Sequence, residues 1–142
     1  MKGFTILELL LVIGAVIIIS ALTIPIGVRF YQTQILNETT SDILGTLRRS
    51  QNQAAFQKNN SAFGVKILSD SYVLFQGNSY VGRTVTEDES FSLSGGITIS
   101  GIDEVVFNKL TGISSTTGTI TVTSGSDSQI LNINAQGKIE RQ

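Results

Sequence analysis

At 142 residues the chain has room for one small globular domain beside a long helix. With 10 basic and 11 acidic residues its net charge is -1, so no broad positive field favours nucleic acid as a partner. Cysteine and histidine are absent, which removes disulfide bonds, the usual nucleophile and base pairs and the commonest zinc ligands. We therefore expect a protein that is not an enzyme and that holds no metal or cofactor.

An apolar run opens the chain and contains a single carboxylate, Glu8. From Leu9 to Val28 there is no charged residue. About 20 apolar residues, each rising roughly 1.5 Å along a helix, suffice to cross a hydrocarbon layer of about 30 Å. This segment is therefore predicted to span a membrane. A carboxylate inside such a run costs on the order of 2.5 to 3.5 kcal/mol, which makes Glu8 a candidate functional residue.

The start of this run resembles a known processing signal. After the short leader Met1-Lys2, the sequence Gly3-Phe4-Thr5-Ile6-Leu7-Glu8 is similar to the type III signal of type IV pilins and type II secretion pseudopilins. The resemblance implies that a prepilin peptidase cuts between Gly3 and Phe4 and methylates the new N-terminal Phe4. It also implies that Glu8 guides filament assembly. Two departures are the order Ile6-Leu7, commonly Leu-Ile, and the unusual shortness of the leader.

Two other interpretations of the N-terminal segment remain open. In a Sec signal peptide, Lys2 would supply the positive region and Ser20-Ala21-Leu22 the small residues near a cut. The position of Glu8 inside the apolar region, and the continuation of that region to Val28, argue against it. An uncleaved membrane anchor is the second alternative, and it leaves Glu8 unexplained.

Pro25 is the only proline in the chain. Inside a helix it lacks a backbone donor and crowds the carbonyl of Ala21, and Gly27 weakens the same turn, so a kink is expected. The resemblance points the same way, because major pilins commonly have a proline at this place, where the helix can unwind in the filament. The alternative is a helix end just outside the membrane.

Helical spacing continues beyond Arg29 while polarity rises. One face is apolar, and its residues are Leu36, Thr40, Ile43, Leu47 and Ala54. The other face carries Glu38, Asp42, Arg48, Arg49 and Lys58. The helix is predicted to end in the polar stretch 58–61, after about 54 residues from Phe4.

The rest of the chain alternates apolar and polar residues over short stretches, which predicts strands. The expected strands are 62–68, 72–76, 80–86, 90–93, 97–100, 104–108, 119–123, 129–134 and 138–141. The first two are expected to form a hairpin, residues 87–89 a solvated acidic loop, and Ala135-Gln136-Gly137 a turn before the last strand. This pattern predicts an α+β fold, with a long N-terminal helix packed on an antiparallel β-sheet or small β-sandwich.

The C-terminal strands add a second resemblance. Val105-Val106-Phe107, Gly118-Thr119-Ile120-Thr121-Val122 and the closing Ile133-Asn134-Ala135-Gln136-Gly137-Lys138-Ile139 look similar to the GspH/FimT branch of minor pseudopilins and minor pilins. In that branch the sheets end in such a glycine-turned hairpin.

Few residues outside these segments indicate chemistry. The acidic clusters 87–89 and 103–104 lack the ligand order of a calcium loop and fit solvated loops better. Arg48-Arg49 has no interleaved aromatics, so it is thin evidence for DNA binding. Asn37-Glu38-Thr39 and Asn59-Asn60-Ser61 match the glycosylation pattern, which is frequent by chance.

The sequence therefore predicts four segments: a leader at 1–3, a transmembrane and filament-core helix at 4–28, an amphipathic half-helix at 29–60 and a β-rich domain at 61–142. The resemblance implies a structural subunit of a type IV pilus-like filament or type II secretion pseudopilus. Its implied partners are prepilin peptidase, other pilin or pseudopilin subunits and an inner-membrane assembly platform. The protein would start as a single-pass inner-membrane protein and end in a periplasmic or extracellular filament. A membrane-tethered extracellular binding or adhesion module, and a secreted enzyme behind a Sec signal, remain as alternatives.

Overall fold

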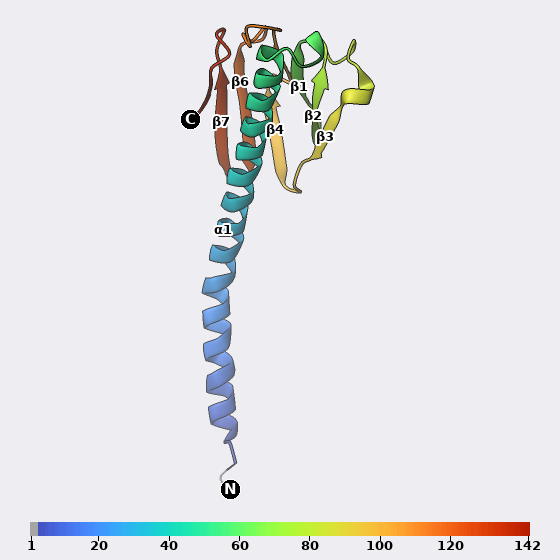
Figure 1. The fold of residues 1–142 in the computed structure, drawn as a ribbon. Coiled ribbons are helices and arrows are strands. Elements are labelled where there is room, and N and C mark those ends of the chain that lie inside the picture. Colours follow the sequence, from blue (N-terminus) through green and yellow to red (C-terminus); the bar gives the residue numbers. More distant parts are fainter. Residues whose placement is uncertain (1–2) are drawn as a thin grey trace. The chain divides into compact units, whose positions relative to one another are not determined.

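The computed structural model describes residues 3–142 of the chain, apart from the side chains of residues 22 and 25 in the first helix. It contains one long helix, α1 (Ile6–Ala55), followed by short 3-10 turns and strands (Figure 1). The chain divides into two compact units, Met1–Gln34 and Ile35–Gln142. Each unit is described by itself.

The first unit consists of the N-terminal part of α1. Its apolar side chains are exposed, as Ile6 (81%) and Ile26 (70%) illustrate. One window of 18 residues in α1 has a mean hydropathy of 2.8, so by length and composition the helix can cross a membrane. The helix assignment continues through Pro25, whose side chain lies outside the described residues. The predicted kink at Pro25 therefore stays a prediction.

In the second unit the strands form two antiparallel four-stranded sheets, in the orders β3-β2-β1-β5 and β4-β6-β7-β8. The strands are β1 (Phe63–Ile67), β2 (Ser71–Gln76), β3 (Glu89–Ser92), β4 (Ile97–Gly101), β5 (Glu104–Phe107), β6 (Gly118–Ser124), β7 (Asp127–Ile133) and β8 (Ile139–Arg141). The fold is thus α+β, as the sequence predicts. The expected β1–β2 hairpin is present, with Val65 opposite Leu74. So is the closing β7–β8 hairpin, with Ile133 opposite Ile139.

The apolar face of α1 forms the core of this unit together with one face of each sheet. All five apolar-face residues predicted from the spacing, Leu36, Thr40, Ile43, Leu47 and Ala54, are buried. Thr40 satisfies its hydroxyl by donating to the carbonyl of Leu36 at 2.7 Å, which lets a polar side chain occupy the core. The charged side chains of the opposite face are exposed.

The last strand is tied to α1 by side-chain hydrogen bonds at Asn37. The Asn37 Oδ1 atom accepts from Gln129 Nε2 of β7 at 2.6 Å and from the guanidinium of Arg141 in β8. Arg141 also donates to the Ser41 hydroxyl at 3.4 Å. We refer to these four residues as the Asn37 clamp. Asn37 is the acceptor position of one glycosylation pattern, and its side chain is engaged in these contacts.

Helix α1 ends a few residues earlier than the sequence predicts. Its last residue is Ala55, and a short 3-10 turn covers Lys58–Asn60. Gln57 separates the two with a left-handed backbone (φ 55°), and Asn59 adopts the same conformation (φ 51°). Left-handed residues cannot continue a right-handed helix, which explains the earlier end.

The strand predicted at 80–86 is wrong. This stretch is part of a loop with a 3-10 turn at Val85–Glu87. Tyr80 lies against Phe75, with the two ring centroids 5.7 Å apart, and so covers a second small cluster of Ala62, Phe75 and Val106. Because neighbouring strand residues face opposite sides, Phe75 lies on the face of its sheet away from α1. In the loop conformation Tyr80 packs on this face and shields Phe75 from solvent.

Candidate functional site

The predicted assembly residue Glu8 lies in the first turn of α1. Thr5 caps this helix end, since its Oγ1 accepts a hydrogen bond from the Glu8 backbone N–H at 3.3 Å. The pair Thr5 and Glu8 thus has the spacing of a capping box, in which a glutamate also favours the positive end of the helix dipole. Sequence reasoning missed this local role, although the Thr-x-x-Glu pattern could have revealed it.

The predicted cleavage residues precede the helix. Gly3 and Phe4 have no regular secondary structure, and Phe4 is 80% exposed. A Cβ atom placed on Gly3 would meet nothing within 4 Å. The leader residues 1–2 lie outside the described residues. The cut after Gly3 and the methylation of Phe4 stay predictions.

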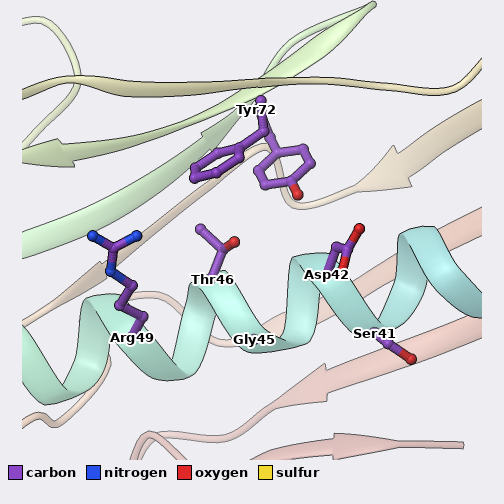
Figure 2. Close-up of a pocket in the computed structure, with 7 residues that line it drawn as sticks. Ser41, Asp42, Gly45, Thr46, Arg49 and Tyr72 are labelled. Atoms are coloured by element: carbon purple, nitrogen blue, oxygen red, sulfur yellow. The ribbon is translucent and has the colours of Figure 1, made fainter.

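A groove of about 350 Å³ lies in the second unit, between α1 and the β2–β3 side of the first sheet (Figure 2). Its lining residues are Ser41, Asp42, Gly45, Thr46 and Arg49 from α1, Tyr72 from β2 and Phe91 from β3. Figure 2 shows Asp42 and Thr46 pointing from the helix toward the Tyr72 ring, and Arg49 extending from the same side of the helix. Gly45 leaves the helix side of the groove open, because no atom lies within 4 Å of the position of its missing Cβ. No local pattern in the sequence indicates this groove.

Aromatic and charged groups share the groove. The rings of Tyr72 and Phe91 stack with their centroids 5.1 Å apart. Burial raises the pKa of the Tyr72 hydroxyl; a hydrogen bond with Thr46 acts in the opposite direction, and the negative charge of Asp42 adds a smaller rise. Arg49 forms an ion pair with Glu89 at 2.6 Å. These features suit an aromatic or cationic side chain of a partner.

Four of the five residues in the two acidic clusters form ion pairs: Asp88, Glu89, Asp103 and Glu104. Asp88 forms an ion pair with Arg83 at 2.7 Å and is only partly exposed. The loop 87–89 is therefore less solvated than the sequence predicts. Asp103 binds Lys66 at 2.7 Å, and this hydrogen bond lowers the pKa of Asp103 and raises that of Lys66. Within residues 3–142, no cluster of three or more acidic side chains is arranged to hold a metal ion.

The architecture, one long N-terminal helix packed on two antiparallel sheets, is a pseudopilin-like fold. In the search of solved structures it is similar to the minor pseudopilin EpsH from the type 2 secretion system of Vibrio cholerae. The TM-score is 0.59 with 11% identity, and the match covers 75% of this chain and 95% of EpsH. No family model and no curated protein sequence matches the chain. The likeness therefore rests on the fold.

Proposed function

We propose that this protein is a structural subunit of a pseudopilus or type IV pilus-like filament, assembled through its N-terminal helix. The observation that carries the proposal is an exposed, uncharged helical stretch with Glu8 at its start, in a chain with a pseudopilin-like fold. An exposed apolar helix of this length needs a bilayer or neighbouring helices to cover it. A filament subunit has both in turn, first the membrane and then the filament core.

Processing after Gly3 is the first step of this proposal. The exposed, non-helical chain at Gly3 and Phe4 supports it, since a peptidase needs chain that is free of helix. Glycine has no Cβ, which eases the approach of the backbone to a narrow active site. The enzyme would be a prepilin peptidase, and it would leave an N-methylated Phe4.

Glu8 would then pair with a positive charge. Cleavage gives Phe4 a free amine, which is positive at neutral pH. A carboxylate in lipid is tolerated when it is paired, and the amine of the neighbouring subunit provides a partner in register. An unpaired Glu8 would thus favour docking into the filament, so that assembly becomes directional.

The remaining partners follow from the same role. The subunit would contact other pilin or pseudopilin subunits and an assembly platform in the inner membrane. Before assembly the helix would cross the inner membrane with residues 35–142 outside the cytoplasm, and after assembly the protein would belong to a periplasmic or extracellular filament.

Intact-mass analysis of the protein from membranes and filaments of the source cells tests the proposal. The expected mass is that of a chain that begins at Phe4 and carries one methyl group. A chain that begins near Leu22 would show a Sec cut and refute the filament role. An uncut chain in the membrane, with no filament form, would favour a membrane-tethered binding module.

A further inference from the structure

An exposed aromatic segment follows the apolar stretch directly. Phe30 is 72% exposed and Tyr31 is 64% exposed. Arg29 precedes them and is the only basic residue between Gly3 and Arg48. Arg29 is exposed, and its guanidinium forms no ion pair with the residues that the structure describes. The segment 29–31 thus offers one cation beside two uncovered rings.

The groove of Figure 2 has the complementary features. Asp42 is exposed on its helix side and makes no ion pair within residues 3–142. The stacked rings of Tyr72 and Phe91 form an aromatic wall, and the missing side chain of Gly45 leaves room opposite. Its volume of about 350 Å³ is at the lower end of the range for binding pockets, which suits a side chain and its neighbours better than a large ligand.

We propose that this groove receives the segment 29–31 of a second copy of the chain. In this contact the guanidinium of Arg29 pairs with the Asp42 carboxylate, and an aromatic ring of the segment packs on Tyr72 and Phe91. Charge and aromatic character together favour this occupant. The segment carries a cation without an ion-pair partner beside two exposed rings, and the groove carries an anion without one, Asp42, beside an aromatic wall; its other charged residue, Arg49, is paired with Glu89. The inference rests on the proposed filament function and deepens it by naming the two surfaces that meet.

The contact joins two different surfaces, so it is heterologous. Each copy donates its segment to one neighbour and offers its groove to another. A heterologous contact that does not close into a ring propagates as an open helical filament. The proposed contact therefore produces the kind of assembly that the proposed function requires, whereas an isologous contact would stop at a dimer.

Disulfide trapping tests the contact, because the natural chain has no cysteine to interfere. The full-length double variant Phe30→Cys, Gly45→Cys is oxidised in assembled material and separated without reductant. We expect a ladder of dimers, trimers and longer chains. Each single variant should give no ladder. The matched control pairs Phe30→Cys with Val81→Cys, whose position is 95% exposed and lies outside the groove, and it should also give no ladder.

Charge reversal gives a second, independent readout in the full-length protein. Asp42→Arg and Arg29→Asp should each lower the assembled fraction at least about tenfold, because like charges then face each other. The double reversal should restore most of the assembly. Glu87→Arg changes the net charge as Asp42→Arg does, on an exposed loop outside the groove, and should leave assembly unchanged. The amount of processed protein in the membrane should be equal in all variants.

The outcomes separate this inference from the function on which it rests. If the wild-type chain assembles but the Phe30–Gly45 pair gives no ladder, or the double reversal restores nothing, the groove contact is refuted and the filament function stands. A ladder with Val81→Cys as strong as with Gly45→Cys also refutes it, since the crosslink would then reflect random collision. If the wild-type chain forms no filament at all, the proposed function fails and the contact fails with it.

Discussion

Replacing Glu8 with glutamine removes its negative charge and keeps the side-chain length and a hydrogen-bond acceptor. The capping role of Glu8 and its proposed pairing role in assembly respond differently to this change. In a capping box glutamine serves nearly as well as glutamate. As the partner of a neighbouring amine, glutamine cannot replace the charge. Glu8→Gln therefore separates assembly from helix capping, whereas Glu8→Ala removes both.

The size of the effect can be worked out for each role. An ion pair at roughly 4 Å with an effective dielectric constant of about 20 gains about 4 kcal/mol. If desolvation offsets half of this gain, about 2 kcal/mol remains, which corresponds to a thirtyfold change in the assembly equilibrium. Losing the cap through Thr5→Ala costs about 1 kcal/mol, or roughly fivefold. Thr5 carries no charge, so Thr5→Ala removes the cap without changing any ion pair and serves as the matched control.

The assay compares the filament fraction with the processed membrane pool for each variant. We expect cleavage after Gly3 in all of them, a strong loss of filaments with Glu8→Gln and Glu8→Ala, and a mild loss with Thr5→Ala. Wild-type assembly of Glu8→Gln, together with equal losses for Glu8→Ala and Thr5→Ala, would show that Glu8 acts through the cap. The charge-pair mechanism would then be wrong.

Three further predictions concern stability and the helix. A fragment of residues 35–142 should show helix and strand by circular dichroism and melt cooperatively; a fragment without a cooperative transition would contradict the assigned core. In this fragment Leu47→Ala, which truncates a fully buried side chain, should lower the free energy of unfolding in urea by about 2 to 5 kcal/mol. The Lys66–Asp103 ion pair should add a small stability between pH 3.8 and 10.5, the usual pKa values of the two groups. This stability should be lost at lower pH as Asp103 is protonated and at higher pH as Lys66 is deprotonated. In Asp103→Asn, the free energy of unfolding in urea should therefore vary less with pH at both ends. A density map of the filament should show the helix unwound or bent near Pro25. Straight helical density there would rule out both the unwinding and the kink.

Local patterns predicted much of the fold because they depend on neighbours in sequence. The three- and four-residue spacing of Leu36, Ile43 and Leu47 identified the face of α1 that is buried in the core. Alternation identified most strands to within one or two residues. The closing hairpin was predictable from its turn, where Gly137 has a positive φ of 81° and a Cβ would come within 2.5 Å of the Gly112 carbonyl oxygen.

Other features depend on residues far apart in sequence, and local patterns could not show them. Strand β1 lies between β2 and β5, so Val65 faces both Leu74 and Val105. Strands β3 and β4 follow each other in the chain but belong to different sheets. The groove likewise arises where α1 meets two strands. At 80–86 the alternation is typical of a strand, but the segment forms a loop in which Tyr80 packs on Phe75. This tertiary contact outweighs the local strand propensity.

The Asn37 clamp has a mechanical consequence. In the proposed filament, tension would pull each subunit along its helix, and in the second unit this force would enter at the beginning, next to Asn37. There the clamp joins the helix to β7 and β8, at the other end of the domain sequence. The clamp would pass such tension directly into the sheet, so that the helix would not peel away from the core turn by turn. A chain without cysteine would in this way resist extension through several hydrogen bonds that are loaded at the same time.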